Sequence, residues 1–187
     1  MNAYSFFRPV ALAASLAIAA TSSLTSCDKE IVLKTLDVKL VSDVVLDVKG
    51  SDPLAAVWIQ ELDPNSNIDV RDNLSKIKKV VVERLAYRVS QFIGPAATKS
   101  SGTWKFYLSD APTQAYTLGT VTDLDLPALD AANTVQDLPL AEDAKAKLVE
   151  AVNGNHKVTF VFDGNVSDRP TYTRFEVQIF TKIDIGA

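Results

Sequence analysis

The sequence predicts a mainly β protein, an antiparallel two-sheet sandwich with two short helices. Apolar and polar residues alternate with period two along most of the chain after residue 31. Turn-forming residues interrupt this alternation at short intervals. Only two stretches have apolar residues at helical spacing. A content of 47% hydrophobic and 22% charged residues is typical of a globular domain.

The first alternating stretch follows the N-terminal 31 residues. Its even positions are apolar: Val32, Leu36, Val38, Leu40, Val44, Leu46 and Val48. Its odd positions are mostly charged: Asp37, Lys39, Asp43, Asp47 and Lys49. The pattern predicts one buried face, either on a strand pair or on one long bent strand, with the bend at Ser42-Asp43.

The C-terminal stretch mirrors the first. One stripe holds Phe175, Val177, Ile179, Thr181, Ile183 and Ile185. Shorter strands are expected at 55–61, 79–92, 103–109, 115–122 and 156–166, with inward stripes Trp104, Phe106, Leu108 and Val158, Phe160, Phe162, Val166. We expect Phe160, Phe162, Phe175, Val177 and Ile179 to be buried together, on segments that pair as a hairpin through Asp168-Arg169-Pro170.

Two helices are expected. Residues 70–78 place Val70, Leu74 and Ile77 on one side, with Asp69 as the N-cap. Residues 140–153 place Leu140, Ala144, Leu148 and Val152 on one face, with an Asp143–Lys147 pair and Gly154 after the last turn. Seven or eight strands with these turns favour a sandwich of broadly immunoglobulin-like architecture, with an up-and-down barrel as the alternative.

The N-terminus has the three parts of a secretory signal. Arg8 supplies the positive charge, residues 10–20 form an apolar core, and Thr21-Ser-Ser begins a polar stretch. The apolar core is shorter than the roughly 20 residues that a membrane span needs.

Leu24-Thr25-Ser26-Cys27 resembles the lipobox of bacterial lipoproteins, and Cys27 is the only cysteine. The resemblance implies a lipid on the Cys27 thiol, cleavage before Cys27 and acylation of the new amino group. Residues 1–26 are then a removed signal, 27–30 an anchor and short tether, and 31–187 a single domain. Asp28-Lys29-Glu30 resembles the sorting signals of lipoproteins. We favour a location of the protein at the outer membrane of a Gram-negative envelope over one at the inner membrane. In its layout the domain resembles small all-β envelope lipoproteins. This resemblance does not assign a function to any residue.

Composition excludes several functions. Arg8 is the only charged residue before Cys27. The remaining chain therefore has 18 basic and 23 acidic residues, and its net charge of −5 is unlike that of a nucleic-acid-binding domain. A lipidated Cys27 is no nucleophile, His156 is the only histidine and is expected in an exposed turn, and no G-x-S-x-G motif is present. No cofactor is expected.

Acidic residues offer two weak alternatives. Asp63, Asn65, Asn67 and Asp69 alternate like the first half of a calcium loop. Ile68 and Leu74 replace the glycine and the glutamate that such a loop requires, so a turn before the helix is the preferred interpretation. Asp123 and Asp125 are a possible carboxylate pair for a hydrolase.

Aromatic residues outside the apolar stripes supply a binding hypothesis. Tyr107, Tyr172, Phe180 and Trp58 would form a platform for a glycan or a partner protein if they shared one outer sheet. The alternative is that a helix or the N-terminal segment covers these aromatic residues, which would then form a second small core. The sequence therefore predicts a membrane-attached domain that binds an envelope protein complex or a surface glycan without catalysis; a carboxylate-dependent hydrolase and a carrier of an apolar ligand are the alternatives.

Overall fold

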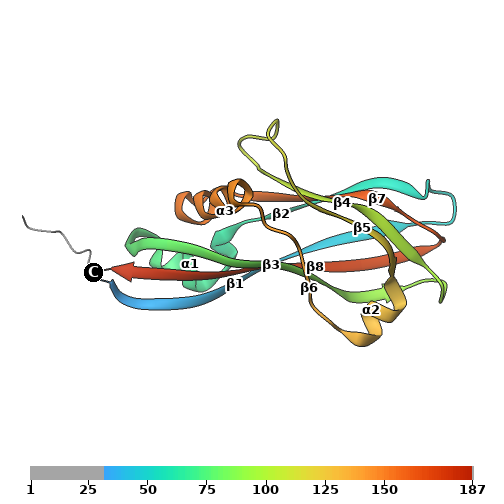
Figure 1. Ribbon diagram of the computed structural model, residues 1–187, viewed down its shortest axis with the longest axis horizontal. Helices are drawn as coiled ribbons and strands as arrows, with labels where there is room; N and C mark the ends of the chain where they lie inside the picture. The colour runs from blue at the N-terminus through green and yellow to red at the C-terminus, as the bar shows by residue number, and fades with distance from the viewer. Residues whose placement is uncertain (1–31, 187) are drawn as a thin grey trace, which may run out of the picture.

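The computed structural model describes residues 32–186 and confirms the predicted sandwich of two antiparallel four-stranded sheets (Figure 1). The strands are β1 (Val32–Val48), β2 (Ala55–Leu62), β3 (Ile77–Ile93), β4 (Lys99–Leu108), β5 (Tyr116–Asp125), β6 (Gln136–Asp137), β7 (Val158–Val166) and β8 (Thr171–Gly186). The helices are α1 (Ile68–Asn73), α2 (Leu126–Ala132) and α3 (Glu142–Gly154), with 3₁₀ turns η1 (Pro64–Ser66) and η2 (Leu74–Lys76).

The strand order is β1-β8-β3-β6 in one sheet, called sheet A, and β2-β7-β4-β5 in the other, called sheet B. The chain therefore crosses between the sheets at every connection except the one from β4 to β5. This nested pairing of β1 with β8, β2 with β7, β3 with β6 and β4 with β5 is the topology of a jelly roll. The predicted two-sheet sandwich architecture is thus confirmed, with jelly-roll connectivity, and the alternative barrel is wrong because the described strands form two separate sheets.

The expected hairpin between the two C-terminal segments is also wrong, because β7 and β8 lie in different sheets. The burial prediction is nevertheless confirmed: Phe160, Phe162, Phe175, Val177 and Ile179 are each at most 1% exposed. Alternation determines which face of a strand is apolar, and both strands turn that face toward the space between the sheets.

Strand β1 is a single long strand. It pairs with β8 without interruption from Thr35 opposite Asp184 to Val48 opposite Thr171, so the pairing is not broken at Ser42-Asp43 and the alternative of two strands is wrong. Its even positions from Val38 onward are buried, as predicted. Strand β8 lies between β1 and β3 and therefore has neighbours on both sides.

An aromatic cluster joins the two sheets. Trp104 of β4 lies with its ring centroid 4.8 Å from Phe162 of β7, 5.4 Å from Phe175 of β8 and 5.6 Å from Tyr87 of β3. Trp104 is fully buried. The space between the sheets is thus filled by side chains, as in other packed sandwiches.

The helices depart from expectation in their bounds and caps. Asn67, and not Asp69, caps α1, since its Oδ1 accepts hydrogen bonds from the Asp69 and Val70 amides. The chain is already extended at Ile77, so the end of the segment expected to be helical belongs to β3. Helix α2 was not expected; the Asp125 side chain caps it by accepting from the Ala128 amide.

Helix α3 is confirmed, with Ala144, Leu148, Ala151 and Val152 on its buried face. Two of its details differ from expectation. Lys147 pairs with Glu150 at 2.6 Å and not with Asp143, whose carboxylate accepts from the Ala144 amide. The left-handed residue after the last turn is Asn155 (φ 56°), one position beyond Gly154.

Candidate functional site

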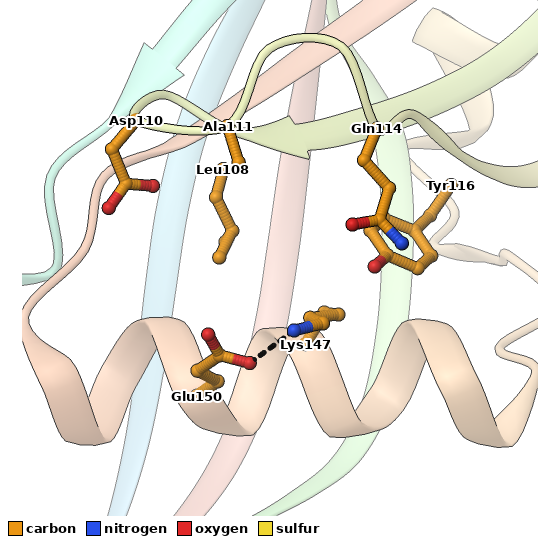
Figure 2. A pocket seen from close by; sticks show the side chains of 7 residues that line it. All are labelled: Leu108, Asp110, Ala111, Gln114, Tyr116, Lys147 and Glu150. Atoms are coloured by element: carbon orange, nitrogen blue, oxygen red, sulfur yellow. Dashed lines mark hydrogen bonds and ion pairs between the residues drawn. The ribbon is translucent and has the colours of Figure 1, made fainter.

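A cleft of about 160 Å³ lies between α3 and the connection from β4 to β5 (Figure 2). Lys147 and Glu150 reach into it from α3, while the opposite wall comes from the end of β4, the connecting loop and the start of β5. The residues on that wall are Leu108, Asp110, Ala111, Gln114 and Tyr116. The volume is below the range of small-molecule sites and suits a single side chain or a small polar group.

Both carboxylates at the cleft are paired with a basic group. Glu150 contacts Lys147 at 2.6 Å, and this hydrogen bond raises the pKa of Lys147. Asp110 contacts Nδ1 of His156 at 2.8 Å. The side chains of Asp110 and Glu150 are 57% and 48% exposed, whereas a general acid at neutral pH needs a carboxyl that burial has desolvated.

The histidine expected in an exposed turn therefore follows a helix end and has a partner. His156 is 38% exposed, and its amide donates to the Ala151 carbonyl beyond the last turn of α3. On the cleft wall formed by the start of β5, Tyr116 stacks on buried Phe106 with ring centroids 5.2 Å apart. The cleft thus has an apolar wall that is continuous with the core, and charged groups at its mouth.

The residues with calcium-loop spacing organise turns. Asp63 caps η1 by accepting from the Asn65 amide at 2.9 Å. Asn67 caps α1 and donates from Nδ2 to the Lys39 carbonyl of β1 at 3.4 Å. Asp69 is exposed in the first turn of α1. Within residues 32–186 no group of three or more His, Cys, Asp or Glu side chains is arranged to hold a metal ion.

The expected carboxylate pair is not a site in the described chain. Asp125 caps α2. Asp123 has φ 52°, and its amide donates to the Ser101 hydroxyl at 2.9 Å. Both side chains are exposed, so neither carboxylate is desolvated by burial.

The four aromatic residues do not form one platform. Tyr107 lies on the outer face of sheet B, while Tyr172 and Phe180 lie on the outer face of sheet A. Trp58 points inward and stacks on Phe162 with centroids 6.0 Å apart. The sandwich thus separates residues that the sequence hypothesis required to be neighbours.

Two of these residues have local surroundings of their own. The Arg84 guanidinium lies 5.2 Å from the Phe180 ring centroid. Tyr172 lines a pocket of about 210 Å³ at one end of the sandwich, together with Ile93 and Pro170. Ile93 is 60% exposed, so this pocket is shallow and partly apolar.

A larger groove was missed by sequence reasoning. It has a volume of about 450 Å³ and lies where the edge strands β1 and β2 adjoin. We call it the side groove; its lining residues are Val41, Ser42, Asp43, Val45, Gln60, Glu61, Leu62, Asp63, Ser66 and Arg174. The available signal was the pair of valines, Val41 and Val45, on the otherwise charged outer face of β1.

Two polar atoms at the side groove lack a hydrogen-bond partner within the described part of the chain. One is Oγ of Ser42, a residue that is 6% exposed, and the other is Nε of Arg174. Leaving such groups unpaired costs free energy, on the order of 1–3 kcal/mol each. Arg174 also lies 3.8 Å from the Asp43 carboxylate.

The predicted lipidation residue, Cys27, lies outside the described residues, as does the whole expected signal. Among residues 32–186, none of the helices has the length and apolar character needed to cross a membrane.

Comparisons with known proteins give little. No protein-family model matches the sequence, and neither does any curated protein. A chain of Desmodium yellow mottle tymovirus aligns over 98% of this chain and 97% of its own, with 8% identity and a TM-score of 0.37. A chain of Mud crab tombus-like virus, from a cryo-EM structure, aligns over 99% and 95%, with 11% identity and a TM-score of 0.36. Likenesses this weak carry no argument about function.

Proposed function

We propose that the chain is a lipid-anchored cell-envelope protein whose β-sandwich binds or scaffolds a partner and performs no chemistry. The observation that carries the proposal is Leu24-Thr25-Ser26-Cys27, which resembles a lipobox and follows the apolar core of a secretory signal by three residues. Two or more acyl chains on Cys27 would hold the protein stably on a membrane. The outer membrane of a Gram-negative cell is the proposed location.

The short tether supports a defined orientation. Val32 follows Cys27 by five residues, a distance of at most about 18 Å when the chain is extended. The start of β1 lies beside the end of β8, since Val32 is opposite Gly186, and both are at the same end of the sandwich (Figure 1). That end would face the membrane, and the connections from β1 to β2 and from β7 to β8 would point away from it.

The non-catalytic part of the proposal is supported by the surroundings of the ionisable groups. The sole histidine is paired with Asp110 at the surface, and the cleft carboxylates are exposed and paired. The side chains that fill the space between the sheets, Trp104 among them, leave little support for a carrier of an apolar ligand. Binding through a sheet edge, a sheet face or the loops is what this architecture supplies.

The proposal is tested in cells. Density-gradient fractionation should place the wild-type protein with outer-membrane markers and release the Cys27→Ser variant from that fraction. In-cell crosslinking followed by mass spectrometry should recover the same envelope partner in replicate preparations. A Cys27→Ser variant that fractionates like wild type would overturn the anchor. Hydrolysis of an envelope glycan by the purified protein would overturn the non-catalytic assignment.

A further inference from the structure

Strand β2 is an open edge of sheet B. It pairs with β7 on one side only, residue by residue from Ala55 opposite Asn165 to Leu62 opposite Val158, with no bulge. Its first six residues, Ala-Ala-Val-Trp-Ile-Gln, contain neither charge nor proline. Proteins ordinarily interrupt such an edge with charges, prolines or bulges, because it is a template for pairing with another strand.

The direction of the β2 backbone groups follows from one hydrogen bond. The Leu54 carbonyl accepts a hydrogen bond from the Val166 amide. The backbone N–H and C=O groups of the even-numbered residues of β2 therefore point toward β7. The N–H and C=O groups of Ala55, Val57, Ile59 and Glu61 therefore point to the open side. Of these groups within residues 32–186, the Glu61 carbonyl accepts a hydrogen bond from the side-chain amide of Gln60 at 3.1 Å.

The side chains beside this edge are apolar and exposed. Val57 and Ile59 are 55% and 58% exposed on the outer face of sheet B. Val161, opposite Ile59 on β7, is only 8% exposed, so the exposed apolar side chains are those of β2. An added strand would cover Val57 and Ile59 while it satisfies the backbone groups.

The other edges of the sandwich are protected. The outer face of β1 carries Asp37, Lys39, Asp43 and Asp47, and the Lys39 carbonyl is already bonded to Asn67. Strand β5 is paired with β4 through two register shifts. Strand β6 covers the middle of β3. Among the edge strands of residues 32–186, β2 is the one that pairs without a bulge and has an uncharged run of six residues.

The charge of the side groove indicates which kind of segment would bind at the β2 edge. The side groove at the C-terminal end of β2 has three carboxylates, Asp43, Glu61 and Asp63, and one guanidinium, Arg174. Lys157 contacts Glu61 at 2.7 Å, and acidic groups still outnumber basic ones. Ser42 and Arg174 also line this groove, although the Ser42 hydroxyl and the Arg174 Nε are themselves buried.

We propose that the β2 edge binds an extended segment of a partner protein by strand addition, with basic residues of that segment beside the side groove and apolar ones beside Val57 and Ile59. The inference deepens the proposed function and rests on it for the choice of occupant. A second copy pairing antiparallel through β2 would point its N-terminus the opposite way, which does not suit two upright molecules tethered by Cys27 to one membrane surface.

The test uses the full chain purified in detergent and a fluorescent ten-residue peptide in which lysine and valine alternate. We expect saturable binding by fluorescence anisotropy at low salt. Replacing every lysine with glutamate should weaken binding at least tenfold. N-methylation of two central residues on one edge of the peptide, which removes their N–H donors, should weaken binding by about tenfold, the loss expected for one or two ladder hydrogen bonds.

Variants place the site on β2. Ile59→Pro removes one outward N–H and should abolish binding, while Ile59→Thr keeps that group and should weaken it only a few fold. Ile93→Thr, an equally exposed position on β3, is the matched control and should bind as wild type. Thermal melts accompany each variant. If Ile59→Pro does not fold, the N-methylated peptide tests the same hydrogen bonds on the wild-type chain.

Several outcomes would overturn the edge proposal: no saturable binding, equal binding of lysine and glutamate peptides, equal binding of the N-methylated peptide, or an Ile59-dependent dimer that excludes the peptide. These outcomes are separate from the anchor. Peptide binding with an unmodified Cys27 would overturn the proposed function alone, and a lipidated protein that ignores the peptide would overturn the strand-addition site alone.

Discussion

Phe162 of β7 and Phe175 of β8 face each other across the sandwich with ring centroids 5.5 Å apart, although their strands follow one another in the chain. Each is fully buried. The connection between β7 and β8 thus carries the chain from sheet B to sheet A, and the two rings pack as partners between the sheets. Trp104 of sheet B packs in the same way against Phe175 and Tyr87 of sheet A, so these rings connect the two sheets.

Truncating a core ring should be costly. Phe160 is 0% exposed and lies 6.2 Å from Phe106, ring centroid to centroid. Phe160→Ala should lower the free energy of unfolding by about 3–5 kcal/mol, because it removes buried surface and leaves a cavity. Chemical denaturation measures the change. Ile59→Ala, at a 58% exposed site, is the control and should change stability little; similar stability losses in both variants would contradict the assigned core.

Two glycines make room for Phe162. Gly102 and Gly164 are opposite each other on β4 and β7, and a Cβ on Gly102 would lie 2.6 Å from the Phe162 ring and 2.8 Å from the Asp163 carbonyl. Gly102→Ala should therefore destabilise the fold by about 1–3 kcal/mol through overpacking. At Gly50 no atom lies within 4 Å of an added Cβ, so Gly50→Ala is the matched control. Equal melting temperatures for both variants would contradict the close packing at Gly102.

The ion pair of Glu176 should make stability depend on pH. Burial raises the pKa of Glu176, but hydrogen bonds from Arg88 and Gln178 and the charges of Arg88 and Lys39 outweigh it, and the net pKa is lower than its ordinary value of 4.5. A lowered carboxyl pKa contributes stability that is present above the unfolded-state pKa and is lost as the pH falls through the folded-state pKa. Stability should thus decline below about pH 4.5.

Glu176→Gln should remove that contribution. Arg88 lies 2.7 Å from Glu176, whose side chain is 13% exposed, so the substitution should cost about 1.5–3 kcal/mol near neutral pH, the range for hydrogen bonds to charged groups. Denaturation curves at several pH values should show a smaller acid-dependent loss than in wild type. Glu150→Gln, which breaks an exposed pair with Lys147, should leave the curves nearly unchanged. An unaltered pH profile in Glu176→Gln would refute this role.

Acylation of Cys27 is the prediction on which the proposed function depends. Intact-mass spectrometry of detergent-extracted protein should show the loss of residues 1–26 and the added mass of two or three acyl chains. Cys27→Ser should yield unprocessed protein that carries no lipid. Correct cleavage of the Cys27→Ser variant, or a mature protein of unmodified mass, would show an ordinary secretory signal instead.

Part of the candidate surface was visible in the sequence. The alternation that exposes Val57 and Ile59 is local, as are the uncharged run in β2 and the two valines on β1. What the sequence did not reveal is that β1 and β2 are edge strands of adjoining sheets, which brings Val41 and Asp43 next to Gln60 and Glu61. The aromatic hypothesis failed for the same reason, because parity along a strand does not tell which sheet the strand joins.

The sequence by itself determined which residues of each strand face inward, where α3 lies and which catalytic residue types are scarce. Side-chain direction repeats every two residues in a strand, so a buried face can be read from neighbours in sequence. Only the tertiary structure decided the jelly-roll connectivity. A strand can bury its apolar face equally well in either sheet. Which sheet it joins is decided by packing between residues far apart in the chain, such as Trp104 against Phe175.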